Sequence, residues 1–358
     1  MSTRGVSLSL VQFPHSKWYQ DADEVYVFIG DVTKQPVYHV EASASVKNRL
    51  QARDKALEKT FLRILHLNDL HGNIAALNRD GPSTNHFSNL YSHIKMRRES
   101  EMTDSQKGLL VFSGGDELGG SPLEQLWIET GVHAVYQLYN QIGLSAATLG
   151  NHDFDLGAEE LARAITMYAR FPILTANIIA EGELAACLFP AAIFNLDGLR
   201  VGVIGITLAN RHKNASNYQI TDPAAAVNHL LPALAEWSDV IVILSHAGYT
   251  LEGDIGLANA IPIGSADLIV GGHTHSEIAP NRGTGEHIVN GIPIVQAGSN
   301  AQVIGDCTFK ILPQTGRARF QNETLVPTSD LEEDIKFSKA FVLPCVDLLQ
   351  KMLRRPLG

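Results

Sequence analysis

The sequence predicts an α/β fold, and two features of the chain support this prediction. Short runs rich in β-branched and aliphatic residues recur along most of the chain, and segments with helical periodicity lie between several of them. Strand runs that are apolar nearly throughout indicate sheets that are covered on both faces. Alternation of such strands with helices is typical of layered α/β folds.

The first 60 residues differ from the rest of the chain. Residues 6–13 (VSLSLVQF) and 24–32 (EVYVFIGDV) are typical of short strands, and residues 44–59 (ASVKNRLQARDKALEK) are typical of a charged helix. No chemistry can be assigned to them. We interpret residues 1–60 as an amino-terminal extension of unknown role, such as a structural or oligomerisation arm.

The regular pattern begins at residue 61. The predicted strands are residues 61–67, 108–114, 146–150, 172–177, 199–207, 239–246, 266–272, 292–299 and 302–312. The predicted helices between them are residues 86–100, 123–143 and 223–237. Residues 331–358 have an acidic start and then the pattern of an amphipathic helix interrupted near Pro344.

Length, composition and charge limit the classes of function. The chain has 358 residues, 45% of them hydrophobic, which is enough for a large core in one or two domains. Its net charge of −10 argues against nucleic-acid polymers as partners, since these bind basic surfaces. A small anionic substrate remains compatible, because a bound metal ion can dominate the local charge.

Three further observations concern the environment of the protein. No run of 18 apolar residues predicts a membrane span, so no membrane partner is expected. The first residues lack an apolar core followed by a small-residue cleavage site, so we expect no signal peptide and a cytoplasmic location. The three cysteines are widely spaced and odd in number, which argues against a disulfide framework.

Side chains able to bind metals follow five of the predicted strands. In open α/β sheets, ligands bind beyond the carboxyl ends of the strands, so these side chains are expected to meet at one edge of a sheet. In chain order they are Asp69 and His71; Asp116; Asn151, His152 and Asp155; His246; and His273 and His275.

Each of these motifs alone is compatible with an ordinary turn or helix cap. The pair His273 and His275 is a stronger signal, because alternate residues of an extended chain point the same way. Five such coincidences, all at strand ends, together favour a metal site.

The motifs DLH, GD, GNHD, SH and GHTH, in this order, resemble those of the calcineurin-like metallophosphoesterases. The stretches HLNDLHGN and GNHDFDLG resemble more closely the catalytic domain of the 5′-nucleotidase and UDP-sugar hydrolase group. The resemblance covers roughly residues 61–330, which we take as a metallophosphoesterase domain. It implies a four-layer α/β/β/α sandwich that holds two divalent metal ions.

The resemblance also implies a role for each residue. The first metal would be held by Asp69, His71 and His275, and the second by Asn151, His246 and His273. Asp116 would bridge both metals. The catalytic histidine would be His152, oriented by Asp155.

This ligand set has a chemical rationale of its own. Two metals that share a water lower its pKa, and the hydroxide so formed attacks phosphorus. Mixed histidine and carboxylate ligands suit Mn, Zn, Fe or Co, with Mg also compatible, and the sequence leaves the metal open. His152, when protonated, can stabilise the transition state or assist the leaving oxygen.

We therefore expect a two-metal hydrolase of phosphate esters, acting on nucleotides or related small phosphorylated metabolites. One alternative is a thiosulfohydrolase-like enzyme with a sulfur substrate. Another is a noncatalytic metal-binding module that needs a partner chain.

Relatives in the resembled group usually carry a carboxyl-terminal domain that grips the nucleoside. Residues 331–358 resemble the helix that leads into it. A homo-oligomer or a partner chain could supply the missing half.

Overall fold

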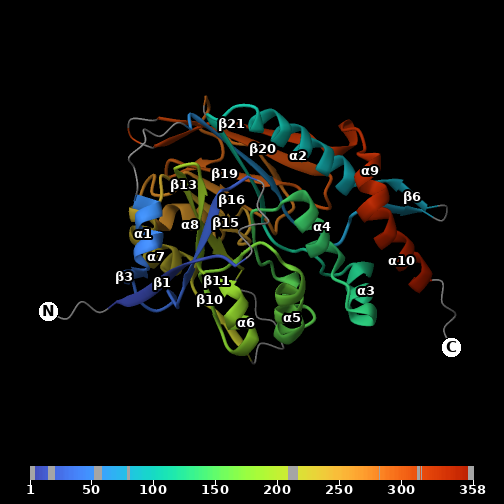
Figure 1. Ribbon diagram of the computed structural model, residues 1–358, viewed down its shortest axis with the longest axis horizontal. Helices are drawn as coiled ribbons and strands as arrows, with labels where there is room; N and C mark the ends of the chain where they lie inside the picture. Colours follow the sequence, from blue (N-terminus) through green and yellow to red (C-terminus); the bar gives the residue numbers. More distant parts are fainter. Residues whose placement is uncertain are drawn as a thin grey trace.

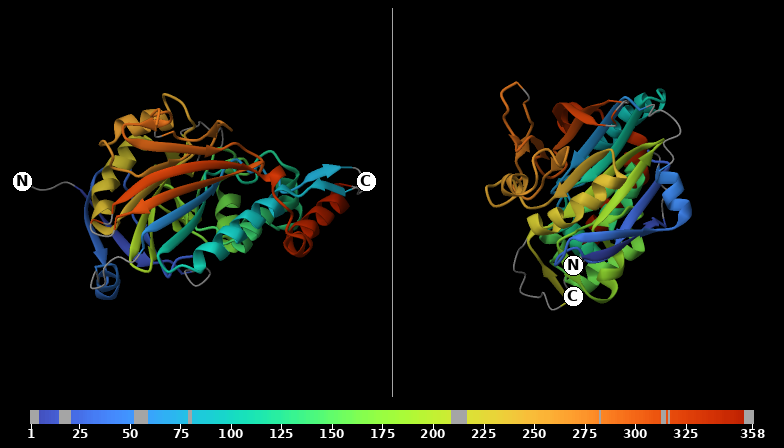
Figure 2. Two further views of the ribbon diagram at one scale, coloured as in Figure 1. Left: turned by 90° about the horizontal axis from the view of Figure 1, so that it is seen from above. Right: turned by 90° about the vertical axis from the view of Figure 1, so that its left-hand side faces the viewer.

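The computed structural model describes residues 5–14, 21–51, 59–78, 81–208, 217–281, 283–312, 315 and 317–353. Two β-sheets pack face to face, and helices cover the outer face of each (Figures 1 and 2). The predicted α/β class and its four-layer α/β/β/α arrangement are therefore confirmed.

The seven-stranded sheet has the strand order β11-β9-β8-β7-β4-β20-β21. Neighbouring strands from β11 to β4 are parallel, whereas β20 and β21 are antiparallel to their neighbours. The bounds are β4 (Phe61–Leu67), β7 (Lys107–Ser113), β8 (Ala146–Thr148), β9 (Ile173–Leu174), β11 (Leu188–Phe189), β20 (Val303–Ile311) and β21 (Ala318–Pro327).

The ten-stranded sheet has the order β17-β19-β16-β15-β13-β12-β2-β1-β3, and β18 pairs with β19. Strands β13, β15, β16 and β19 are parallel. The bounds are β1 (Val6–Gln12), β2 (Glu24–Ile29), β3 (Val37–Ala42), β12 (Ala191–Leu196), β13 (Leu199–Ile206), β15 (Val240–Ser245), β16 (Leu268–Val270), β17 (Glu277–Ile278), β18 (Ile288–Val289) and β19 (Ile292–Ala297).

The remaining strands form two short two-stranded sheets. They pair β5 (Ala76–Asn78) with β6 (Gly81–Thr84), and β10 (Ile178–Ala180) with β14 (Tyr218–Ile220).

The helices form the two outer layers. One hydrophobic cluster joins the seven-stranded sheet to α2 (His86–Met102), α3 (Pro122–Thr130), α4 (Ala134–Ile142), α5 (Ala158–Tyr168) and α6 (Gly182–Cys187). A second cluster joins the ten-stranded sheet to α1 (Ala44–Gln51), α7 (Pro223–Trp237) and α8 (Asp254–Ala260). In Figure 1 the second group lies on the left, and α2, α3 and α4 lie on the right.

The apolar strands fill both interfaces because side chains alternate between the two faces of a strand. In β15, Val240, Val242 and Leu244 pack between the sheets, whereas Ile241 and Ile243 pack under the helices. All five are buried, which explains why this strand is apolar throughout and not alternately polar.

The amino-terminal strands are part of the larger sheet. Strand β2 pairs antiparallel with β12, β1 pairs with β2, and β3 pairs with β1. Asp21 also accepts two hydrogen bonds of 2.6 Å from Arg98 on α2, which belongs to the opposite outer layer. The segment that the sequence marked as an extension thus contributes three strands and α1 to the fold.

Truncating a buried side chain in this segment should destabilise the whole domain. Phe28 on β2 is 0% exposed within the cluster beneath α1 and α7. We expect Phe28→Ala to lower the free energy of unfolding by about 3–5 kcal/mol, because it leaves a cavity. Chemical denaturation monitored by circular dichroism measures this change. Tyr38→Ala, at an exposed position of β3, is the matched control, and equal stability of both variants would contradict the expectation.

The carboxyl-terminal segment is helical from residue 335 to residue 353. It consists of α9 (Ile335–Phe337), a π-helical turn (Ser338–Val342) and α10 (Leu343–Leu353). The π-helical turn ends two residues before Pro344, which has no N–H to continue the regular α-helical bonding. Phe337 stacks on Tyr91 of α2 with a centroid distance of 3.9 Å, so the segment packs against its own domain.

Within the described residues, no helix combines the length and the apolar character that crossing a lipid bilayer requires.

Candidate metal centre

The predicted site residues lie where the carboxyl ends of the two sheets meet. Strands β4, β7 and β8 of the seven-stranded sheet lead into Asp69 and His71, Asp116, and Asn151 and His152. Strands β15 and β16 of the ten-stranded sheet lead into His246, and into His273 and His275. The sequence predicted that these side chains meet at one edge of a single sheet. In the structure they come from the facing edges of two sheets.

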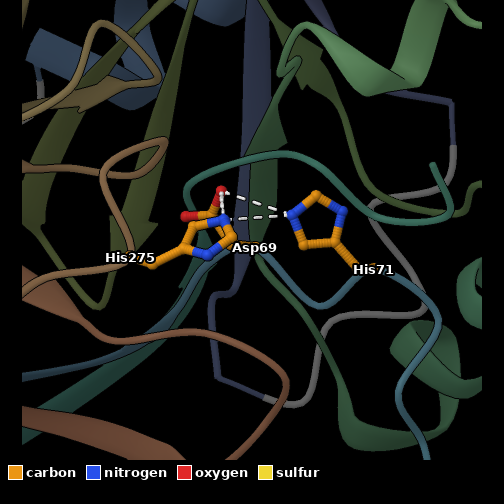
Figure 3. A group of neighbouring side chains, drawn as sticks. All are labelled: Asp69, His71 and His275. Atoms are coloured by element: carbon orange, nitrogen blue, oxygen red, sulfur yellow. Dashed lines mark hydrogen bonds and ion pairs between the residues drawn. The ribbon is translucent and has the colours of Figure 1, made fainter. Parts of the chain in front are cut away.

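Asp69, His71 and His275 form the first group of metal-competent side chains. Figure 3 shows the two histidine rings turned toward one another beside the carboxylate of Asp69. The Nε2 atoms of His71 and His275 are 3.1 Å apart. Asp69 Oδ1 lies 3.2 Å from His275 Nε2 and 3.8 Å from His71 Nε2. Three potential ligand atoms thus converge on one point.

Asp116, His246 and His273 form the second group. His246 Nε2 lies 3.0 Å from Asp116 Oδ2, and the rings of His246 and His273 have centroids 5.4 Å apart. Asp116 Oδ2 is also 3.9 Å from His71 Nε2 of the first group. One carboxylate oxygen therefore lies between the two groups.

Backbone carbonyls fix which ring nitrogen faces the centre. His246 Nδ1–H donates to the Gly114 carbonyl at 2.6 Å, and His71 Nδ1–H donates to the Gly119 carbonyl at 3.1 Å. In the neutral ring, each bond keeps the proton on Nδ1 and leaves the lone pair of Nε2 toward the centre, which is how metal-binding histidines are normally oriented.

The charges also suit a cation. Burial would raise the pKa of Asp116, but its interaction with His246 lowers it to about 2, so the carboxylate stays ionised. Burial and the nearby charge of His246 lower the pKa of His273, which favours the neutral imidazole that a metal needs.

The residues fit a metal site on a second, independent criterion. Asn151 Oδ1 is among the described buried polar atoms that have no hydrogen-bond partner. Asn151 is 6% exposed, and its neighbour His152 donates its backbone N–H to Asp116 Oδ1 at 2.8 Å. Buried polar atoms are rarely left unpaired, and a cation would satisfy this amide oxygen, whose neighbour in the chain contacts Asp116.

His152 and Asp155 form a hydrogen-bonded pair at the surface of the site. His152 Nδ1 and Asp155 Oδ2 are 2.7 Å apart, and the histidine side chain is 45% exposed. Burial lowers the pKa of His152, but the hydrogen bond of Asp155 and the charge of Asp116 outweigh it, so the net pKa is raised. The ring centroid of His152 lies 5.4 Å from that of His71.

Five of the predicted ligands have left-handed backbone conformations, which non-glycine residues seldom adopt. They are Asp69 (φ 50°), His71 (φ 46°), Asp116 (φ 60°), His273 (φ 73°) and His275 (φ 53°). Such strain persists only where the surrounding structure enforces it, and it clusters at functional sites.

Sequence reasoning missed the residues that support the ligands. Asp153 accepts backbone N–H bonds from Asp116, Glu117 and Gly150 at 3.0, 2.9 and 2.8 Å. It therefore ties the loop after β7 to the loop after β8. Burial and the charge of Asp116 raise the pKa of Asp153 to about 6. Asp153 is the last residue of the GNHD motif, and this position could have indicated a role at the site.

Asn68 supports Asp69 in a similar way. Its side-chain amide donates to Asp69 Oδ2 at 2.7 Å and to the Gly298 carbonyl at 2.6 Å, and its oxygen accepts from Ala297 N at 2.8 Å. Asn68 precedes Asp69 in the sequence, but this position alone does not indicate that its side chain supports Asp69.

We expect Asp153→Asn to weaken metal binding by about tenfold, because an amide replaces one acceptor oxygen with a donor that faces backbone N–H groups. Titration calorimetry with Mn²⁺ measures the effect. Glu159→Gln, at an exposed position of α5, is the control. Unchanged affinity in Asp153→Asn would show that the two loops hold their geometry without this carboxylate.

An open cavity of about 450 Å³ lies over the first group. Its lining includes His71, His152, His273 and His275 together with Asn73 and Asn300. A cavity of this volume is large enough for a small-molecule ligand.

Residues 62–277 match the family described as calcineurin-like phosphoesterase. Among curated proteins, the chain is 27% identical to a 5′-nucleotidase of Vibrio cholerae over 308 aligned residues that cover 76% of this chain and 52% of that protein. The chain spans about half the length of the curated relatives that it matches, from 45% to 58%.

Two solved structures show how far the fold likeness extends. The calcineurin-like phosphoesterase YfkN of Bacillus subtilis superposes with a TM-score of 0.70 at 22% identity and covers 83% of this chain and 100% of that one. The sulfate thiohydrolase SoxB of Thermus thermophilus superposes with a TM-score of 0.61 at 19% identity and covers 100% of this chain and 63% of that one. On the family match and the fold, this chain belongs to the calcineurin-like phosphoesterases.

Proposed function

We propose that this protein is a two-metal hydrolase of phosphate esters, with nucleotides or related small phosphorylated metabolites as substrates. The observation that carries the proposal is the position of Asp116 Oδ2, 3.0 Å from His246 and 3.9 Å from His71. A carboxylate oxygen shared by two groups of metal-competent side chains suits a pair of metals that act together.

In this proposal each group holds one divalent cation. Asp69, His71 and His275 hold the first; Asn151, His246 and His273 hold the second; and Asp116 contributes to both. Bound there, the two ions would lower the pKa of a water molecule and neutralise charge on the phosphoryl oxygens.

The protein's own proton donor in this proposal is His152. Its Nδ1 is engaged by Asp155, so its Nε2–H is available to an oxygen of the substrate. The ring borders the open cavity, which lets it reach a phosphoryl or leaving-group oxygen. Asp155 keeps the imidazole charged and holds its orientation.

Recognition of the rest of the substrate is a separate part of this proposal. The Vibrio relative is named a 5′-nucleotidase and is about twice as long as the matched region. We propose that contacts to the part of the substrate beyond the phosphate come partly from this chain and partly from a second copy or a partner chain.

Hydrolysis of a panel of substrates, after loading with Mn²⁺, tests the proposal. The panel contains AMP, UDP-glucose, a cyclic nucleotide, p-nitrophenyl mono- and diesters, and an organic thiosulfate for the sulfur-substrate alternative. We expect release of phosphate from at least one monoester. Two bound metals per chain without turnover of any compound would instead support a noncatalytic metal-binding module.

The pH profile of the proposed activity should change when Asp155 is replaced. The interaction with Asp155 raises the pKa of His152, and the protonated form is the proposed acid. We therefore expect Asp155→Asn to lower that pKa, so kcat/KM falls at a lower pH on the alkaline side than in the wild type. A pH profile of kcat/KM measures the shift. An unchanged alkaline limb would mean that a different group titrates there.

A further inference from the structure

The cavity over the metal centre has a wall that the proposed chemistry does not use. Besides His152 and the histidine ligands, Asn73 and Asn300 line this cavity. Among the described residues that line this cavity there is no lysine or arginine. Whatever part of a substrate reaches this wall therefore meets neutral amide groups and no cationic side chain.

The two asparagines form one hydrogen-bonded unit. Asn73 Nδ2 donates to Asn300 Oδ1 at 2.7 Å and to the His71 carbonyl at 3.2 Å. Asn300 Nδ2 donates one hydrogen to Ser299 Oγ at 3.0 Å. Each amide nitrogen carries two hydrogens and each amide oxygen accepts. The pair thus keeps Asn73 Oδ1 as an acceptor and the second N–H of Asn300 as a donor, with neither engaged by a described residue.

The backbone places this unit in a fixed position relative to the first metal group. Asn300 N donates to the Asp69 carbonyl at 2.8 Å, and Asn73 follows His71 by two residues. Asn300 and Ala301 both have left-handed conformations, with φ of 59° and 55°. Two such residues in succession are uncommon outside glycine, which indicates that the structure enforces this turn.

We propose that Asn73 and Asn300 are specificity-determining residues that bind adjacent hydroxyl groups on the leaving group of the ester. This inference rests on the proposed function, since it assumes that the phosphoryl group occupies the metal centre. A hydroxyl group both donates and accepts, so two neighbouring hydroxyls match one free acceptor and one free donor. Neutral amides hold such a group without attracting a second phosphate.

The test compares AMP with 2′,3′-dideoxy-AMP, which lacks both ribose hydroxyls, and with p-nitrophenyl phosphate. The variants are Asn73→Ala, Asn300→Gly and the double variant. Glycine preserves the left-handed backbone at position 300. Asn322→Ala, at an exposed position of β21, is the control. If the double variant does not fold, Asn73→Ala at its exposed position carries the comparison alone.

We expect the wild type to favour AMP over the dideoxy compound by about tenfold in kcat/KM, the range of one or two neutral hydrogen bonds. The variants should lose this preference through KM, with p-nitrophenyl phosphate turnover unchanged within about twofold. Equal losses on all three substrates, or no wild-type preference, would overturn the inference.

A binding measurement separates this inference from the proposed function. Titration calorimetry of the Mn²⁺-loaded protein uses the nonhydrolysable methylene phosphonate analogues of AMP and of dideoxy-AMP. A roughly tenfold difference in Kd that disappears in Asn73→Ala supports the subsite even if no ester is hydrolysed. Equal Kd values in the wild type overturn the subsite even if both esters are hydrolysed.

Discussion

Asp116→Asn is expected to lower kcat/KM for phosphate esters by about 10³-fold or more, the largest effect of any single substitution in the site. The lost carboxylate oxygen lies within 4 Å of histidines from both groups, as Asp69 Oδ1 also does. Its negative charge offsets the repulsion between two cations held close together. A neutral amide leaves that repulsion uncompensated, so we also expect fewer than two metals per chain.

The asparagine is chosen because it preserves the local structure. Its oxygen still accepts the backbone N–H of His152, as Asp116 Oδ1 does at 2.8 Å. Metal content by elemental analysis and turnover of the best substrate are measured together. Asp347→Asn, at an exposed position of α10, is the control for removing one negative charge. Two bound metals and wild-type turnover in Asp116→Asn would rule out a shared role for this carboxylate.

The position of the site could be predicted because it depends on local sequence. Apolar strands followed directly by polar residues mark the carboxyl ends of parallel strands, and ligands gather there. Asp69, Asp116 and His246 each follow a buried strand within a few residues, and the structure brings them together. The pairing of His152 with Asp155 has the same local origin, since the two residues are three positions apart on one turn.

The arrangement of the sheets could not be predicted in the same way. Strand β2 pairs with β12, more than 160 residues later, and no local periodicity encodes that partner. For this reason the first 60 residues looked separate from a sheet that they extend. The sequence shows where strands end but not which sheet each strand joins. The facing edges of two sheets were therefore interpreted as one edge.

The sequence pattern also could not predict the backbone conformation of the ligands or the contacts that support them. The left-handed conformations of Asp69 and His273 follow from hydrogen bonds between distant loops, such as His273 N to Asp69 Oδ2 at 2.8 Å. Glu117, beside Asp116, is fully buried, and burial and the charge of Asp153 raise its pKa well above the usual range. Its carboxyl oxygens accept hydrogen bonds from the hydroxyl groups of Ser113 and Tyr139 behind the site. Nothing in the flanking sequence distinguishes it from an exposed turn residue.

His152→Ala is expected to lower kcat by about 10²- to 10⁴-fold while both metals remain bound. The ring is engaged by Asp155 and not by the carboxylates of the two metal groups, so its loss removes a proton donor without removing a ligand. Its backbone N–H, which contacts Asp116, is retained. In His152→Ala, turnover should therefore fall while metal content stays unchanged. In Asp116→Asn, both should fall.

The choice of substrate shows what His152 does. If it protonates the leaving oxygen, the loss should be much smaller for p-nitrophenyl phosphate, whose leaving group needs little protonation, than for an alkyl ester. If it stabilises charge on the phosphoryl oxygens, both esters should lose rate equally. His39→Ala, at an exposed position of β3, controls for the loss of a surface imidazole. Loss of metal in His152→Ala would instead place this histidine among the ligands, because a proton donor outside the metal groups can be removed without releasing the ions.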